Sequence, residues 1–122
     1  MSQLLDSLRN NRIVPLVQSN DSTTALKISE ALLKGGLDVV GVVWRTDEEL
    51  DCLEAIVEEF AQAHVGAGTV LNAEQAQEVI RRGADFIVSP GLDLSSVKVA
   101  RAAGISILPG IATATELQEA FN

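Results

Sequence analysis

Apolar and polar positions along the chain come in alternating blocks. Short runs rich in Val, Ile, Leu and Ala begin near Arg12 (RIVPLV), Leu37 (LDVVGVVW), Ala63 (AHVGAGTV), Ala84 (ADFIVS) and Ile105 (ISILPGI). Continuous apolar runs of this kind are typical of parallel strands that are buried on both faces. The stretches between them place apolar residues three or four positions apart, as helices with one buried face do. The pattern therefore predicts a repeated strand–helix unit.

Helix boundaries are marked by their own signals. Residues 46–49 (TDEE) and 113–116 (TATE) predict capping boxes, in which the threonine hydroxyl accepts a backbone amide proton and the glutamate reaches back. Asn72 begins a further helix in a similar way, and Gly83 predicts a left-handed stop at its end. Another helix is expected at about residues 3–10, before the first strand.

Two architectures fit repeated units of this type. Right-handed crossovers build either an open, flavodoxin-like sheet with helices on both faces or part of a (β/α)₈ barrel. In both, the fold class is α/β with a parallel sheet, and we expect one domain over residues 1–122. Five strands in a partial barrel leave two edges unpaired and an apolar interior exposed, so we expect the chain to form a homo-oligomer.

Composition narrows the classes of function. With 47% hydrophobic residues and a mean hydropathy of +0.22, the 122-residue chain can fold around a core. No apolar run is long enough for a membrane span, and a net charge of -8 argues against nucleic acid or anionic membranes as partners. A single cysteine, Cys52, excludes an internal disulfide, and no Cys/His cluster predicts a metal site. The amino terminus has no signal-peptide core, so we expect a cytoplasmic protein.

Candidate chemistry gathers where strands end and helices begin, and parallel strands place all these loops on one rim. The loops are Arg45-Thr46, Gly66-Ala67-Gly68-Thr69, Ser89-Pro90-Gly91 and Pro109-Gly110. Arg45 is the cation at a strand end, and beside helix amino termini it predicts a site for a carboxylate or phosphate. The alternative is a surface arginine paired with Asp47 or Glu48.

Other chemically active residues favour structural interpretations. Residues 66–69 resemble a phosphate-binding turn but lack its third glycine and a following lysine, so close packing explains them better. His64 lies at the start of a strand, away from Ser89, which argues against a hydrolase. Cys52 lies within a helix near no base, and Trp44 is expected to pack.

Two sets of charged residues complete the search. The carboxylates of one helix are predicted to form a solvated face: Glu48, Glu49, Asp51, Glu54, Glu58 and Glu59. The lysines Lys27, Lys34 and Lys98 fall in helices, whereas imine chemistry in a barrel needs a lysine at a strand end. The residues thus predict a binding site that lacks a catalytic nucleophile.

The ordered motifs RIVPLV, ALLKGGLDVV, WRT, VGAGTVLNAEQ, GADFIVSPG and ILPGIATATEL resemble those of the 2-keto-3-deoxy-6-phosphogluconate and 4-hydroxy-2-oxoglutarate aldolases. The resemblance covers residues 12–121 and implies a (β/α)₈ barrel, of which this chain would be a five-stranded part with a preceding helix. The family implied is trimeric and class I: it uses no metal or other cofactor and cleaves its substrates to pyruvate and an aldehyde. A lysine forms an imine with the keto group and a glutamate shuttles protons.

The resemblance also implies residue roles. Arg45 matches the arginine that holds the substrate, Thr69 matches a threonine beside the pyruvate portion, and Ser89, Pro90 and Gly91 match the loop lining that pocket. A pyruvate-like 2-keto acid is therefore the expected small-molecule partner.

Two departures separate this chain from the family pattern. The second-strand pattern Glu-Val-Thr-Leu-Arg-Thr is replaced by Gly-Val-Val-Trp-Arg-Thr, so the glutamate position is Gly41 and a threonine position is Val43. The imine lysine of the family lies on a sixth strand, beyond Asn122. We therefore expect a lyase-family chain that is inactive alone, the alternatives being a self-associating half-barrel and a carboxylate-binding module.

Overall fold

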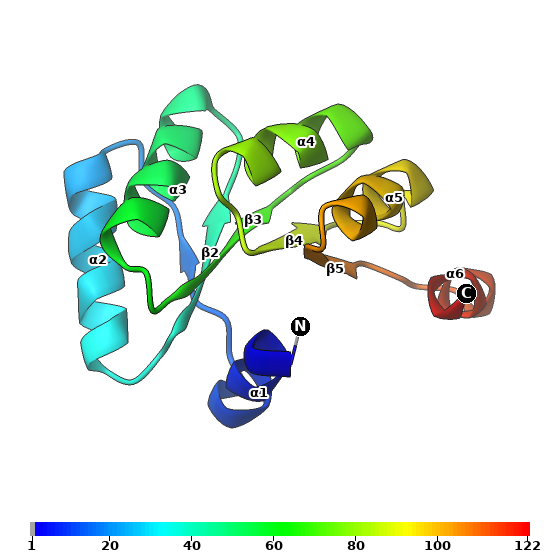
Figure 1. Ribbon diagram of the computed structural model, residues 1–122, viewed down its shortest axis with the longest axis horizontal. Coiled ribbons are helices and arrows are strands. Elements are labelled where there is room, and N and C mark those ends of the chain that lie inside the picture. Colours follow the sequence, from blue (N-terminus) through cyan, green and yellow to red (C-terminus); the bar gives the residue numbers. More distant parts are fainter. Residues whose placement is uncertain (1) are drawn as a thin grey trace.

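The computed structural model of the protein describes residues 2–122 as an alternation of helices and strands (Figure 1). The strands are β1 (Leu16–Val17), β2 (Val39–Val43), β3 (His64–Gly68), β4 (Phe86–Ser89) and β5 (Ser106–Pro109). The helices are α1 (Ser2–Asn11), α2 (Ser22–Lys34), α3 (Asp47–Glu59), α4 (Ala73–Arg81), α5 (Leu94–Ala102) and α6 (Ala114–Phe121). The repeated strand–helix unit and the helix before it are therefore present as predicted.

The strands form one parallel sheet in the order β1-β2-β3-β4-β5. In this order each strand lies next to its neighbour in sequence. A flavodoxin-like sheet would instead reverse its strand order at a switch point. The order confirms the α/β fold and favours a barrel segment over the open-sheet alternative.

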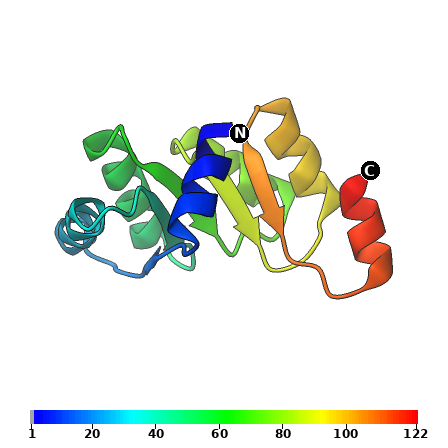
Figure 2. The same ribbon diagram turned by 90° about the horizontal axis from the view of Figure 1, so that it is seen from below.

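The two faces of the sheet are covered differently. Helices α2 to α5 lie along one face, which we call the outer face, while α1 lies across the opposite, inner face (Figures 1 and 2). The larger core joins the outer face to its helices and includes Val40, Val42, Leu53 and Ile56. A smaller core on the inner face joins Leu4 of α1 to residues such as Phe86. This one-sided arrangement is that of a barrel wall.

The carboxyl-terminal unit has fewer neighbours than the others. Helix α6 lies at one end of the molecule, apart from α2 to α5 (Figure 1), and has no buried residue. Its Phe121 is 85% exposed, and Leu117 is exposed as well. Strands β1 and β5 each pair on one side only within residues 2–122. The five-stranded sheet is therefore open at both edges.

Local signals place the helix ends as predicted. Both capping boxes form: the hydroxyls of Thr46 and Thr113 accept from the amides of Glu49 and Glu116, whose carboxylates reach back. Asn72 caps α4, and Gly83 after it has a φ of +96°. In the described part of the chain, no helix has the length and apolar character needed to cross a membrane.

The first strand is shorter than its apolar run predicts. Only Leu16 and Val17 pair with β2, although the run begins at Arg12. Arg12 has a φ of +63°, which interrupts extended backbone just after α1. Pro15 has no amide proton to give to a neighbouring strand, and its carbonyl accepts the Gly41 amide at 2.9 Å. The chain therefore joins the sheet only at Leu16, several residues after the apolar run begins.

Candidate functional site

The predicted rim exists because the sheet is parallel. Beyond the ends of the strands, hydrogen bonds still connect neighbouring loops: the Trp44 amide donates to the Gly68 carbonyl at 3.2 Å, and the Gly110 amide donates to the Ser89 carbonyl at 2.9 Å. A Cβ at residue 110 would collide with the Pro90 carbonyl, so the close approach of these two loops requires glycine. The loops after β2, β3, β4 and β5 are thereby held against one another.

A cavity of about 210 Å³ opens on the inner face at this rim. It is lined by Val14, Leu16, Gly41, Val43, Ala67, Gly68, Thr69, Val88, Ser89 and Pro90. Positions singled out in the sequence, among them 41, 43, 69, 89 and 90, thus meet at one site. Residues 41 and 43 line it because side chains alternate along β2, whereas Val40 and Val42 face the outer core.

Thr69 has a backbone conformation unusual for its type. Its φ is +64°, in the left-handed region that β-branched residues rarely adopt. Thr69 is exposed at the end of β3. Such strain persists where the surrounding structure imposes it, and it concentrates at functional sites. Thr69 lies on the cavity lining rather than in the core.

The loop after β4 divides between two hollows. Ser89 is buried and its hydroxyl donates to the Gly91 carbonyl at 2.8 Å, which fixes the turn around Pro90. Gly91 itself does not line the 210 Å³ cavity; it borders an adjacent hollow of about 190 Å³ with Val70 and Leu92. Ser89 and Pro90 thus lie on the rim cavity, whereas Gly91 lies on the neighbouring one.

Arg45 is exposed on the same rim, two residues beyond Val43, but outside the cavity lining. Among residues 2–122 its guanidinium has no ion-pair partner, so the predicted alternative of pairing with Asp47 or Glu48 is not seen. The backbone amides of Arg45 and Thr46 both donate to Glu49, which is 4% exposed. The Arg45 side chain is therefore available to a ligand.

The helix amino termini at the rim are already capped from within. Glu116 accepts the amides of Ala112 and Thr113 before α6, as Glu49 does before α3. Asp93 accepts the Ser96 amide before α5. Hydrogen bonds from the hydroxyls of Ser95 and Ser96, together with this amide, hold the pKa of the Asp93 carboxyl below its usual range. These acidic caps oppose anion binding at the amino termini of α3, α5 and α6, whereas α4 is capped by the neutral Asn72.

Most carboxylates of α3 are exposed as predicted, namely Glu48, Asp51, Glu58 and Glu59, whereas Glu54 is half-buried and Glu49 is buried. Arg82, which follows α4, donates to Asp51 at 3.0 Å and to Glu54 at 2.7 Å, and it also pairs with Glu78. These carboxylates raise the pKa of the Arg82 guanidinium. Glu49 is consumed by the cap. Asp51 and Glu54 therefore join α3 to the end of α4, and no sequence signal linked Arg82 to them.

The remaining reactive side chains lie away from the cavity. Burial raises the pKa of the Cys52 thiol, whose Sγ donates to the Ser19 carbonyl at 3.2 Å. His64 is the first residue of β3 and Ser89 is the last residue of β4, so the two lie at opposite ends of the parallel strands. Within residues 2–122 there is no cluster of three or more His, Cys, Asp or Glu side chains able to hold a metal ion. Lys27 and Lys34 lie on α2 and Lys98 on α5.

The structure also adds residues that sequence reasoning missed. Val14, Leu16 and Val88 line the cavity, although each was treated only as part of an apolar run. Leu16 pairs in register with Gly41. The apolar character of the two strands does not by itself reveal this register, because strands of similar composition can be aligned in more than one way.

Sequence comparison places these features in a family. Residues 4–122 match the family model described as "Aldolase: KDPG and KHG aldolase". The chain is 38% identical to a 2-dehydro-3-deoxy-phosphogluconate aldolase of Treponema pallidum over 122 residues, which is 100% of this chain and 58% of that protein. The chain thus spans about half the length of the curated relatives it matches.

Solved structures agree. A 4-hydroxy-2-oxoglutarate/2-dehydro-3-deoxyphosphogluconate aldolase from TTHB1 superimposes with a TM-score of 0.87 at 32% identity, covering 96% of this chain and 57% of that one. A KDPG aldolase from Legionella pneumophila, with pyruvate captured as a covalent carbinolamine, gives 0.83 at 32% identity, covering 88% and 52%. The sequential parallel strands, the rim site and both comparisons lead to one conclusion: the chain belongs to the KDPG and KHG aldolase family.

Proposed function

We propose that this chain binds a pyruvate-like 2-keto acid at the rim of β2, β3 and β4. The observation that carries the proposal is the cavity that brings Thr69, Ser89 and Pro90 together beside the unpaired Arg45. Support comes from the Legionella relative, which was captured with pyruvate. The ligand class is set by chemistry: a cation for a carboxylate, and a hydroxyl for a keto oxygen.

Each side chain has a role in this proposal. The Arg45 guanidinium pairs with the ligand carboxylate through charge-assisted hydrogen bonds. The Thr69 hydroxyl donates to the keto or carboxylate oxygen, because its left-handed backbone holds it on the cavity lining. Pro90 lines the cavity on the side of Ser89, and Ser89 fixes the Pro90 turn through its hydrogen bond to Gly91.

We propose further that the 122-residue polypeptide, by itself, does not cleave carbon–carbon bonds. Gly41 has no side chain to move a proton, and losing a general base costs about two to four orders of magnitude in rate. Lys27, Lys34 and Lys98 lie on helices and none lines the cavity. Imine chemistry requires a lysine beside the bound keto group, so the residues present bind the ligand without reacting with it.

Calorimetry with pyruvate tests the binding proposal. Arg45→Ala is expected to weaken binding about tenfold or more, since a charged hydrogen-bonding partner is lost, while Arg45→Lys retains part of the affinity. Arg9→Ala, which removes an equal charge from the exposed face of α1, serves as the matched control and leaves binding unchanged. Equal affinities of the Arg45→Ala variant and the unaltered chain would refute the role of Arg45.

Borohydride trapping tests the absence of imine chemistry. Reduction in the presence of pyruvate is expected to leave the mass of the chain unchanged, because no described lysine reaches the cavity. A stable adduct on Lys27, Lys34 or Lys98 would contradict the proposal, and peptide mapping would identify the residue.

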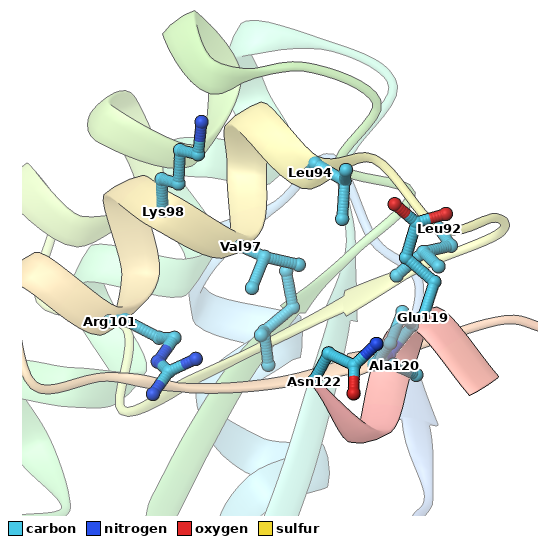
Figure 3. Close-up of a pocket in the computed structure, with 10 residues that line it drawn as sticks. Leu92, Leu94, Val97, Lys98, Arg101, Glu119, Ala120 and Asn122 are labelled. Atoms are coloured by element: carbon cyan, nitrogen blue, oxygen red, sulfur yellow. The ribbon is translucent and has the colours of Figure 1, made fainter. Parts of the chain in front are cut away.

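A second candidate function, self-association, rests on a separate observation. A cleft of about 370 Å³ separates α5 from α6, and Leu94, Val97, Ile107 and Ala120 contribute to its apolar lining. Figure 3 shows Val97 facing the space beside α6, while the amino group of Lys98, which also lines the cleft, points away from α6. With β5 unpaired on one side, a second copy of the chain could cover this edge by placing its own β1 beside β5.

Sedimentation tests this second function. The unaltered chain is expected to sediment as a dimer or larger assembly, and Phe121→Ser to shift it towards the monomer because Phe121 is 85% exposed on α6. Ile28→Ser, on the outer helix α2, is the control for loss of an exposed apolar side chain. A well-folded monomer at all concentrations would exclude self-association.

A further inference from the structure

The wall of the rim cavity formed by β1 and β2 is apolar. Of the residues that line the cavity, only Thr69 and Ser89 carry polar side chains, and the Ser89 hydroxyl proton is already given to Gly91. The opposite side consists of Val14, Leu16 and Val43, with Gly41 between them. A ligand in this cavity therefore meets hydrogen-bonding groups on one side and hydrocarbon on the other.

Leu16 and Gly41 together determine the shape of this wall. The two residues are partners in the β1–β2 register. A Cβ built at Gly41 would lie only 2.7 Å from Cδ2 of Leu16, so the Leu16 side chain occupies the space that a side chain at residue 41 would need. Leu16 is 64% exposed because its strand, β1, lies at an open edge of the sheet. Its methyl groups are therefore open to whatever enters the cavity.

Val43 completes the wall at the end of β2. It is 9% exposed, and what remains accessible is methyl surface at the cavity. Val88 of β4 adds further hydrocarbon. A polar group placed here would lose its hydrogen bonds to water without replacement, which is unfavourable, whereas an aliphatic group would gain by leaving water. The wall thus discriminates by the polarity of the ligand's non-carboxylate end.

We propose that Leu16 and Val43 make this site selective for 2-keto acids with a short aliphatic chain over pyruvate itself. The inference rests on the proposed 2-keto acid site and adds the chemistry of its second half. The carboxylate lies towards Arg45, the keto oxygen towards Thr69, and the aliphatic chain extends along Leu16 and Val43. A hydroxylated chain of equal length is disfavoured, because its hydroxyl finds no partner on that wall.

The test is calorimetry with pyruvate, 2-oxobutanoate and 2-oxopentanoate. Affinity is expected to rise about fourfold for each added methylene, as expected for a CH₂ group transferred out of water. Leu16→Thr and Val43→Thr are each expected to reduce that gain by half or more, where the gain is the ratio of 2-oxobutanoate affinity to pyruvate affinity in the same variant. Leu16→Thr is informative even if Val43→Thr impairs folding, because Leu16 is largely exposed. Ile28→Thr on α2 is the matched control and retains the full gain.

The outcomes separate the two proposals. Arg45-dependent pyruvate binding with no gain, or a loss, along the series would overturn the aliphatic selectivity and leave the proposed 2-keto acid site intact. A gain that persists unchanged in Leu16→Thr and Val43→Thr would also overturn it, because the wall would not be its source. Failure of all three acids to bind would overturn the proposed function, and this inference with it.

Discussion

Helices α3 and α6 begin with the same local device and end in different environments. Each starts at a threonine whose hydroxyl accepts the amide three residues on, and each has the matching glutamate, Glu49 or Glu116. Helix α3 buries Leu50, Cys52, Leu53 and Ile56. Helix α6 buries nothing.

The difference shows that a capping box and an apolar stripe are enough to form a helix but do not ensure that its apolar face is buried. Helix α3 packs against α2 and contacts both β2 and β3. Helix α6 follows β5, which has no strand on its far side within residues 2–122. A helix in a parallel fold is buried by the two strands that it connects. Within residues 2–122 only one of these two strands, β5, is present, so this helix is exposed.

The largest expected effect comes from truncating the apolar stripe of each helix. Leu53→Ala is expected to lower the free energy of unfolding by about 2–5 kcal/mol, because it leaves a cavity in the outer core. Leu117→Ala, on the exposed stripe of α6, is expected to change it by less than about 0.5 kcal/mol in the monomer. Urea denaturation at low protein concentration measures both. Equal losses would mean that α6 is packed in solution.

The caps give a smaller effect of the same kind. Thr46→Ala is expected to cost about 1 kcal/mol of global stability, since α3 is part of the cooperative core. Thr113→Ala removes an equivalent cap but is expected to increase hydrogen exchange only in residues 114–121, with the global unfolding midpoint unchanged. A global loss in Thr113→Ala comparable to that of Thr46→Ala would contradict the comparison.

Helix α1 sharpens the contrast, because it precedes the repeated strand–helix units yet is anchored by polar bonds. Asp38 accepts from Ser7 Oγ and from Asn11 Nδ2, both at 2.8 Å. The Ser7 hydrogen bond, with that of Asn11, lowers the pKa of this carboxyl from 3.8. A depressed folded-state pKa stabilises the fold above the unfolded value, and that contribution disappears as pH falls through the folded value.

Asp38→Asn is therefore expected to lower stability by about 0.5–1 kcal/mol at neutral pH. The deficit should shrink below about pH 4 and vanish where Asp38 is protonated in both states. Urea unfolding measured between pH 2 and 7 gives the profile. A deficit independent of pH would show that the Asp38 charge does not hold α1.

Much of the fold was predictable from sequence because its signals are local. The helix starts at Thr46, Asn72 and Thr113 depend on side chains within one turn of the amides they satisfy. The parallel strands follow from continuous apolar runs separated by helix-length segments, and a parallel sheet places their loops on one rim. The positions of Arg45 and Thr69 on this rim were therefore predictable without coordinates, and the resemblance to the family singled them out as candidate site residues.

Only the tertiary structure decided which residues from distant parts of the chain come into contact. The meeting of Leu16 with Gly41 depends on strand register, and the pairing of Arg82 with Asp51 depends on how α4 lies against α3. The left-handed conformation of Thr69 runs against the preference of its own side chain, so it is imposed by the loops around it. Sequence determined which segments become helices and strands, because those preferences act over a few residues. The composition of the cavity wall and the exposure of α6 arise from residues far apart in the chain, and only packing brings them together or leaves them uncovered.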